Sequence, residues 1–320
     1  MSQLRRNIVT GEWVIIAQER KGRPYHFGKQ KHEEKCPFCP GSEEMTPGET
    51  LRISDGEDWI LRVVPNKFPA VCIENESVDD RDLFYSLCEG TGRHEIVIET
   101  PLHDKTLHHL GKEQIFKVFT AYRERFVQLS KLQDIQYVQI FKNCGKNGGA
   151  SLPHSHSQIV ALPFIPPRLR QEMEGAKRYY DQKGQCVFCE MIRAEVNSQD
   201  RLIYQNGHFI VAAAFAPQFA YEAVFLPTLH QQDFGQVEDK VLYALADAFE
   251  NTMQMMEKIL GEFPYNLVLH TVPYGMEEDA YHWHLELMPR VSYHAGFEMA
   301  TGTFLNSVSP EEAAKRIRGF

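Results

Sequence analysis

The sequence predicts an α+β protein whose two halves repeat one plan, a mostly antiparallel sheet with a helix packed on one face. The first observation is an internal repeat, because motifs of the first half recur about 130 to 150 residues later in the second. The second is size and composition. With 320 residues, 43% of them hydrophobic, the chain can form two domains or one large core shared by two halves.

The repeated elements follow the same order in both halves. Each half has a Cys-x-x-Cys pair and then a strand-like run that ends in a histidine, at residues 95–103 and 222–230. Apolar residues next recur at helical spacing over 115–129 and 241–256. Each half should therefore place one amphipathic helix on its sheet.

Two further strands complete each half. The first of them is expected at residues 137–141 and 265–269, and a glycine-containing loop leads to the second. Strand alternation puts the polar residues of each second strand on one face. These residues are His154, His156 and Gln158 in the first half and His282, His284 and Glu286 in the second.

The segments outside the repeat divide the chain. Residues 1–90 form an N-terminal arm, in which short strands at 13–16 and 61–65 should extend the first sheet. The proline-rich start and polar, helix-like remainder of 163–185 suggest a linker. The predicted halves are therefore residues 1–165 and 166–320.

Composition narrows the class of protein. The net charge of -9 and pI near 5.9 argue against a nucleic-acid-binding protein, whose affinity for a polyphosphate depends on clustered Lys and Arg. The sequence shows no apolar signal segment and no run of about 18 apolar residues that could span a membrane. We therefore expect a cytoplasmic protein. Seven cysteines, four of them in two Cys-x-x-Cys pairs, favour metal binding over disulfides.

Each half offers four metal ligands in the same order, and a closed set of two cysteines and two histidines is typical of zinc. A single Cys-x-x-Cys pair could also be two buried small residues. The repetition of the pair together with its histidines favours metal, with a mainly structural role, because four protein ligands leave no position for a substrate. The predicted sets are Cys36, Cys39, His103 and His154, and Cys186, Cys189, His230 and His282. A less favoured alternative places a different metal on Glu172, His270, His284 and Glu286.

His156 is the candidate nucleophile. If a metal holds His154, the imidazole of His156 lies beside it on the same face and remains available for chemistry. A neutral imidazole attacks phosphorus well and divides a nucleotidyl transfer into two displacements. A lone histidine is otherwise most often a hydrogen-bonded core residue.

The residues around His156 favour phosphate chemistry. The glycine-containing loop upstream lets backbone amides approach phosphate oxygens, although a flexible hairpin loop would look the same. Downstream, Gln158 can donate a hydrogen bond to a phosphoryl oxygen. The candidate phosphate contacts are Asn143, Gly148, Gly149, Ser151 and Gln158.

At these residues the sequence resembles the galactose-1-phosphate uridylyltransferase family of the histidine-triad superfamily, over nearly the whole chain. The shared motifs are the first Cys-x-x-Cys, the segment His103-Asp104-Lys105-Thr106-Leu107 and the loop that ends in His154-x-His156-x-Gln158. The resemblance implies that His156 is the nucleophile and that the first Cys2His2 set binds zinc. It assigns phosphate contacts to Asn143, Gly149, Ser151 and Gln158.

The resemblance also implies a homodimer. The family's Arg-x-x-Arg-Pro element matches Arg20 and Arg23, which in relatives reach the active site from the partner subunit. Without the resemblance, two such arginines would be read as part of a solvated face. Candidates for contacts with the base are Val64, Asn66 and Phe68.

Departures from the uridylyltransferase pattern point to a particular branch. Ser155 replaces a proline, while Ser292 and Phe304 stand where the family places a lysine and a glutamine that serve the hexose phosphate. The two replaced positions argue against recognition of galactose 1-phosphate. The segment His154-Ser155-His156-Ser157-Gln158, the second Cys2His2 set and the segment 302–306 resemble the adenylyltransferase branch, which includes ADP-glucose phosphorylase.

The sequence thus predicts ping-pong transfer of a nucleoside monophosphate between a nucleotide sugar, UDP- or ADP-glucose, and a sugar 1-phosphate or inorganic phosphate. One alternative is a histidine-triad hydrolase or phosphorylase of dinucleoside polyphosphates. Another is a non-catalytic nucleotide sensor with zinc scaffolds.

Overall fold

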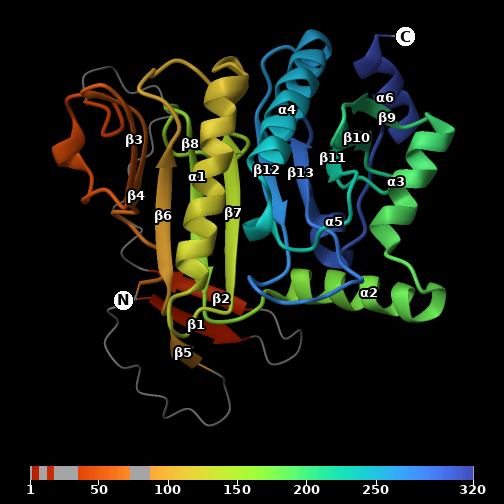
Figure 1. Ribbon diagram of the computed structural model, residues 1–320, viewed down its shortest axis with the longest axis horizontal. Coiled ribbons are helices and arrows are strands. Elements are labelled where there is room, and N and C mark those ends of the chain that lie inside the picture. Colours follow the sequence, from red (N-terminus) through yellow and green to blue (C-terminus); the bar gives the residue numbers. More distant parts are fainter. Residues whose placement is uncertain (1, 7–12, 18–34, 73–86, 320) are drawn as a thin grey trace.

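A computed structural model describes residues 2–6, 13–17, 35–72 and 87–319 of the chain. Its main feature is one ten-stranded sheet in the order β3-β4-β6-β8-β7-β12-β13-β11-β10-β9, with antiparallel neighbours throughout (Figure 1). In the first half the strands are β3 (Leu51–Asp55), β4 (Asp58–Pro65), β6 (Arg93–Ile98), β7 (Tyr137–Cys144) and β8 (His156–Leu162). In the second half they are β9 (Leu202–Gln205), β10 (Phe209–Ala213), β11 (Ala223–Pro227), β12 (Tyr265–His270) and β13 (His284–Pro289).

The two halves share one sheet and one core. They meet where β7 pairs with β12, from Phe141 opposite Val268 to Cys144 opposite Tyr265. The long helices α1 (Lys112–Ser130) and α4 (Asp239–Leu260) lie side by side on one face of the sheet (Figure 1). Their buried apolar residues recur at helical spacing and join a single cluster that spans both halves.

The remaining elements surround this sheet. The helices are α2 (Pro167–Lys183), α3 (Val187–Ser198), α5 (Gly296–Thr301) and α6 (Pro310–Arg318), and the 3-10 helices are η2 (Glu43–Met45), η3 (Leu107–His109) and η4 (Phe234–Gln236). A separate three-stranded sheet has the order β2-β1-β5, formed by β1 (Ser2–Arg6), β2 (Trp13–Ala17) and β5 (Leu87–Glu89).

The fold confirms most of the predicted elements and corrects three. The strand predicted at 61–65 does extend the first sheet as β4, but the strand at 13–16 belongs to the small sheet, where it pairs with β1. The predicted linker is largely the helix α2, which packs on α3. His154 and His282 each lie two residues before the start of a strand, not within it. The boundary between residues 165 and 166 stays a prediction.

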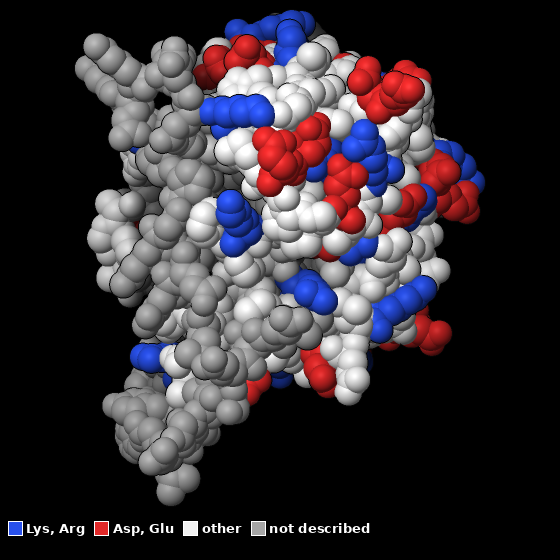
Figure 2. Space-filling model, turned by 90° about the vertical axis from the view of Figure 1, so that its left-hand side faces the viewer, with Lys and Arg blue, Asp and Glu red and all other residues white. Residues whose placement is uncertain are grey.

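The helices and one face of the surface show how apolar and charged residues are distributed. None of the helices in the described ranges is both long and apolar enough to cross a membrane. Figure 2 shows one face of the molecule, where Lys and Arg side chains alternate with Asp and Glu.

Candidate active site and metal centres

The end of β8 near His156 has two differently built faces. His156 lies opposite Ile98 and Gln158 lies opposite Phe141, and their side chains point away from α1 because the alternate residue Ile159 packs in the shared core. Ser157, between them, donates to Glu99 on the α1 side. The sequence therefore places the candidate catalytic groups on one face and their support on the other.

The first predicted metal set converges in space. The sulfur of Cys39 lies 3.2 Å from His103 Nδ1 and 3.6 Å from His154 Nδ1, and the sulfur of Cys36 lies 3.6 Å from the same His154 atom. In a tetrahedral zinc site, a sulfur and a nitrogen ligand are separated by about 3.6 Å, from metal–ligand distances of about 2.3 and 2.05 Å. The four side chains therefore fit a zinc ion.

The surroundings of this set suit a bound metal. His154 Nε2 donates to the Thr100 carbonyl at 2.8 Å, which leaves Nδ1 as the ligand atom. Burial and the adjacent Cys36 raise the pKa of the Cys39 thiol to about 11. The thiolate that zinc needs is thus not stabilised by the protein alone, and a metal must displace the proton.

The second predicted set repeats this geometry. The Cys189 sulfur lies 3.4 Å from His230 Nδ1 and 3.7 Å from His282 Nδ1, and Cys186 completes a group whose ligand atoms lie within 4.8 Å of one another. Burial and Cys186 raise the pKa of the Cys189 thiol to about 11. Both Cys2His2 groups could hold a metal, and their chemistry is compatible with zinc.

The first metal centre is linked directly to His156. The His156 Nδ1–H donates to the carbonyl of His154 at 2.8 Å, so the lone pair of the neutral imidazole lies on Nε2. His154 could thus bind the metal through its ring while its backbone carbonyl orients the ring of His156. The Phe38 ring packs 5.3 Å from His156 and fixes its position from the Cys-x-x-Cys side.

Gln158 is oriented by a second histidine. The Ala70 backbone amide donates to His94 Nδ1 at 3.0 Å, so the His94 proton is on Nε2 and donates to Gln158 Oε1 at 3.0 Å. The amide group of Gln158 then has its hydrogens available on the other side. Asn66, predicted to lie near the base, is 3.1 Å from the same His94 nitrogen and so is close to Gln158.

Asn143 is oriented in the same way by the second half of the chain. Asn266 on β12 donates to Asn143 Oδ1 at 2.8 Å and to the Gly148 carbonyl at 2.7 Å. Arg290 donates to Asn266 Oδ1 at 2.9 Å and fixes that amide in turn. The amide hydrogens of Asn143, like those of Gln158, can therefore donate to a phosphoryl oxygen.

The loop between these strands depends on its glycines. A Cβ at Gly148 would lie 2.2 Å from the Cys144 carbonyl oxygen, and Gly149 has φ +83, which favours glycine. Ser151, in the same loop, is buried. The predicted phosphate contacts of this loop thus lie in a backbone shape that larger side chains would disturb.

A buried ion pair supports the catalytic segment from the α1 face. Lys142 Nζ lies 2.7 Å from Glu99 Oε2 and donates to Ser155 Oγ at 3.0 Å and to the His156 carbonyl at 3.1 Å. Burial alone would raise the pKa of Glu99, but Lys142 and the serine hydroxyls hold it below its ordinary value. Glu99 therefore stays charged behind the nucleophile.

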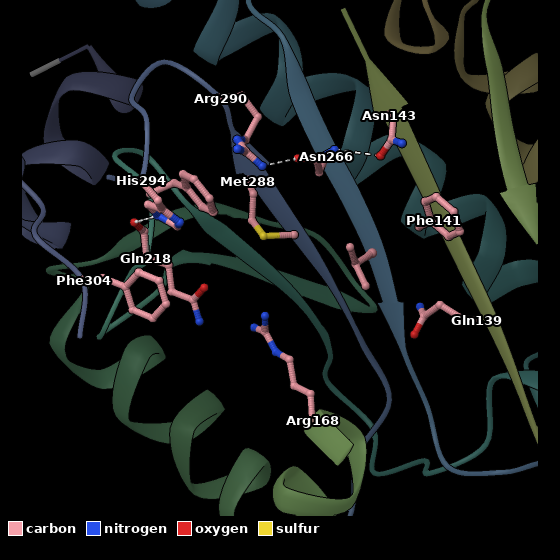
Figure 3. Close-up of a pocket in the computed structure, with 12 residues that line it drawn as sticks. Gln139, Phe141, Asn143, Arg168, Gln218, Asn266, Met288, Arg290, His294 and Phe304 are labelled. Carbon is pink, nitrogen blue, oxygen red and sulfur yellow. Dashed lines mark hydrogen bonds between the residues drawn. The ribbon is translucent and has the colours of Figure 1, made fainter. Parts of the chain in front are cut away.

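A pocket of about 460 Å³ lies on the same face as Gln158, over β7, β12 and β13. Figure 3 shows Arg168 and Arg290 pointing toward it from two elements, with Asn143 at one edge and Phe304 at another. The Arg290 guanidinium also lies 4.4 Å from the centre of the Phe219 ring. The pocket thus offers two cations and several amides close to the candidate phosphate contacts.

The less favoured metal site, Glu172 with His270, His284 and Glu286, is a hydrogen-bonded cluster. His270 Nδ1 lies 3.0 Å from Glu172 and its Nε2 lies 3.2 Å from Glu286. Burial opposes a charge on His270, but the two carboxylates raise its pKa to about 9. Burial would raise the pKa of Glu172, but the hydrogen bond from His270 and its charge lower that pKa to about 2. Three of the four residues come close enough to hold an ion, yet both nitrogens of His270 already face carboxylates.

Not every predicted residue can be compared. Arg20 and Arg23 lie outside the described residues. Phe68 is half-buried, and its backbone amide donates to the Asn66 side chain, whereas Val64 is fully buried in a small core cluster. The sequence did not predict Glu99, Lys142, His94, Asn266 or Arg290 as parts of the site. Among these residues, only Asn266 could have been found from the sequence, because it lies in β12, the strand of the second half that corresponds to β7.

Comparison with known proteins identifies the family. Residues 1–166, more than half of the chain, match the family model "Galactose-1-phosphate uridyl transferase, N-terminal domain". The chain belongs to the galactose-1-phosphate uridylyltransferase family. Residues 112–319 also match a domain of unknown function, DUF4921. Membership in the uridylyltransferase family confirms the predicted resemblance and the predicted enzyme class, nucleotidyltransferase.

Sequence relatives and solved structures match over nearly the whole chain. The chain is 34% identical to the ADP-glucose phosphorylase of Arabidopsis thaliana, over 99% of this chain and 92% of that protein. It is 29% identical to the galactose-1-phosphate uridylyltransferase of Thermotoga maritima, over 99% of this chain and 98% of that protein. The crystal structure of an Arabidopsis thaliana ADP-glucose phosphorylase with bound ADP-glucose has a TM-score of 0.81 at 33% identity, and covers 100% of this chain and 99% of that one. A uridylyltransferase structure has a TM-score of 0.85 at 29% identity, and covers 99% of this chain and 97% of that one. The likeness confirms the predicted α+β fold class.

Proposed function

We propose that the protein transfers a nucleoside monophosphate from a nucleotide sugar to inorganic phosphate, through a covalent nucleotidyl intermediate on His156. The observation that carries the proposal is the orientation of His156, whose Nδ1 is held by the His154 carbonyl so that Nε2 can attack. The similarity to an ADP-glucose phosphorylase at 34% identity favours ADP-glucose as the donor and phosphate as the acceptor.

The first displacement forms a bond between His156 Nε2 and the α-phosphorus and breaks the bond to the bridging oxygen. Sugar 1-phosphate leaves with that oxygen, and the imidazole becomes a cation whose Nδ1–H bond to the His154 carbonyl strengthens. The amides of Gln158 and Asn143 donate to the α-phosphoryl oxygens as their charge increases. Ser151 and the amides of Gly148 and Gly149 complete these donors in the proposal.

The second displacement restores the imidazole. An oxygen of the acceptor phosphate attacks the α-phosphorus, the phosphorus–nitrogen bond breaks, and a nucleoside diphosphate leaves. Arg168 and Arg290 in the adjoining pocket supply positive charge for an anionic acceptor or leaving group. Arg20 and Arg23 remain proposed contacts to the diphosphate from a partner subunit.

We also propose that zinc occupies both Cys2His2 groups and that the protein is a homodimer. A bound zinc would hold Cys36 and Cys39 against His103 and His154, and supply structural cross-links, not chemistry. The C-terminal segment supports a subunit contact, because it exposes a row of large apolar side chains. These are Val291, Tyr293, Phe297, Met299 and Leu305. A cytoplasmic location stays a prediction.

The test is transfer of label from α-phosphate-labelled ADP-glucose and, separately, UDP-glucose. We expect an acid-labile label on the protein, lost in His156→Gly and kept in His284→Gln, which changes the corresponding histidine of the second half. Absence of label from every nucleotide sugar would refute the covalent mechanism. Added phosphate should then release the label as nucleoside diphosphate.

A second candidate is uridylyl transfer to a hexose 1-phosphate. The similarity to the Thermotoga maritima uridylyltransferase over 98% of that protein supports it. In this case galactose 1-phosphate, and not inorganic phosphate, would remove the label, and the product would be a nucleotide sugar. Against it stand Ser292 and Phe304, at positions where the family resemblance calls for a lysine and a glutamine; Phe304 here lines the pocket.

A further inference from the structure

A third cluster of possible metal ligands lies away from the sites described above, where the two halves pack together. His108 and His109 are consecutive residues of η3 in the first half, and Glu257 belongs to α4 in the second. Their ligand atoms lie within 4.8 Å of one another. The family motifs around His103 and His156 do not include this cluster.

One hydroxyl orients both imidazoles. Thr106 Oγ1 lies 3.3 Å from His108 Nδ1 and 2.9 Å from His109 Nδ1, so its two lone pairs can accept an Nδ1–H bond from each ring, which places the lone pair of each neutral imidazole on Nε2. Both Nε2 atoms consequently face the Glu257 carboxylate, that of His109 at 3.1 Å and that of His108 at 3.8 Å. Partners on the second ring nitrogen that fix the first are the usual support of histidine ligands.

The spacing fits a first-row divalent ion. A nitrogen and a carboxylate oxygen bound to one tetrahedral zinc are separated by about 3.3 Å, from metal–ligand distances of about 2.0 to 2.1 Å. The two measured separations bracket this value.

The cluster of His108, His109 and Glu257 differs from the His270 cluster in the direction in which the histidine nitrogens point. His270 faces one carboxylate with each of its two nitrogens, so its contacts spread in two directions. In the third cluster the two Nε2 atoms and the carboxylate converge on one point. The site is also open, because the side chains of His109 and Glu257 are 36% and 29% exposed.

We propose that His108, His109 and Glu257 bind a divalent transition-metal ion, Zn²⁺ or an ion of similar preference, with water completing its coordination. Two imidazoles and one carboxylate suit zinc, cobalt, nickel and copper, and differ from the sulfur-rich Cys2His2 groups. The ion joins η3 to α4 and so cross-links the two halves on the helix face of the sheet. The proposal does not depend on the proposed transferase function.

The test uses the full chain with both Cys2His2 groups first filled with zinc. Titration with Co²⁺ should then show one further equivalent, with a dissociation constant of about 10 μM or tighter. Its visible absorption should lack the intense sulfur-to-cobalt charge-transfer band, because its ligands are nitrogen and oxygen. Calorimetry counts the equivalents independently of the spectrum.

Two variants and one control decide the result. His109→Ala and Glu257→Gln each change a partly exposed side chain, and each should lose the further equivalent while the two zinc ions stay bound. Glu250→Gln, on the same helix, should behave as the unchanged protein. The proposal is wrong if no further equivalent binds below about 100 μM free Co²⁺, or if both variants still bind it.

Discussion

Replacing Lys142 by methionine tests the buried ion pair behind His156. The side chains of Lys142 and Glu99 are 2% and 0% exposed, and Nζ lies 2.7 Å from Oε2. At this distance the Coulomb attraction is about 6 kcal/mol for an effective dielectric constant of about 20. Most of that attraction offsets the cost of removing both charges from water, so the pair's net contribution is small. Removing one partner, however, leaves the other charge buried, and we expect Lys142→Met to lower the free energy of unfolding by about 3–5 kcal/mol.

The same substitution should slow the formation of the covalent intermediate. Lys142 donates to the Ser155 hydroxyl and to the His156 carbonyl, so its loss frees the backbone that aims His156 Nε2. A misplacement of this kind costs about 10- to 100-fold in rate. Arg125→Met is the matched control, because Arg125 forms a buried pair with Glu95 at 2.6 Å on the same face but bonds Gln128 instead of the catalytic segment.

The assay combines urea unfolding of the zinc-loaded protein with the initial rate of nucleotidyl labelling under conditions where each variant is folded. Both variants should lose stability, and only Lys142→Met should lose labelling rate. In the double variant Lys142→Met/Glu99→Gln, about 2 kcal/mol of the summed loss should be recovered, because the two residues interact. A loss below about 1 kcal/mol for Lys142→Met, or equal labelling rates for Lys142→Met and Arg125→Met, would refute the reasoning.

Three other outcomes follow from the site. Asn266→Leu should reduce the single-turnover labelling rate about 10-fold, because Asn143 loses the donor that orients its amide. The melting temperature should also fall, because the Gly148 carbonyl and Arg290 lose the same partner. Removal of metal by a chelator should abolish labelling before the chain unfolds globally, as followed by circular dichroism, and added zinc should restore it, because the His154 carbonyl orients His156. The third concerns pH. The raised pKa of His270, about 9, means that its stabilising contribution is complete below about pH 6.5 and declines as the pH rises through 9. Urea unfolding should therefore show that the free energy of unfolding falls between pH 6.5 and 9, and His270→Asn should remove this pH dependence. A metal bound to His270 would keep the ring neutral, and the unchanged protein would then show no such pH dependence.

The metal ligands and the nucleophile could be predicted because their chemistry restricts the residue type. Only cysteine, histidine and a few other residues bind zinc, so Cys36, Cys39 and His154 were visible in the sequence and repeat with their spacing in the second half. The amphipathic helices were visible for a similar reason, because burial on one face imposes a period of 3.6 residues.

The supporting residues could not be predicted because they depend on contacts between distant segments. Asn266 reaches Asn143 only because β12 pairs with β7, and this pairing joins two halves whose local patterns do not specify it. Lys142 and Glu99 are charged residues of types that are mostly exposed, and only the folded structure shows that they bury each other. The sequence of α2 indicates a linker because the helix buries few apolar residues, Leu169 and Ala176 among them.

The second half keeps the backbone of the catalytic motif but surrounds it with the wrong charge for phosphate. His284 Nδ1 lies 3.1 Å from the His282 carbonyl, as His156 Nδ1 lies 2.8 Å from that of His154. Its Nε2, however, lies 3.9 Å from the Glu172 carboxylate, and its ring stacks on His270 at 4.6 Å. A nucleotide that approached this nitrogen would bring an anionic phosphate close to the part-buried Glu172 carboxylate, which repels it. The duplicated architecture thus provides two similar scaffolds, and the exchange of Gln158 for Glu286 at corresponding positions contributes to confining the proposed nucleophile to one of them.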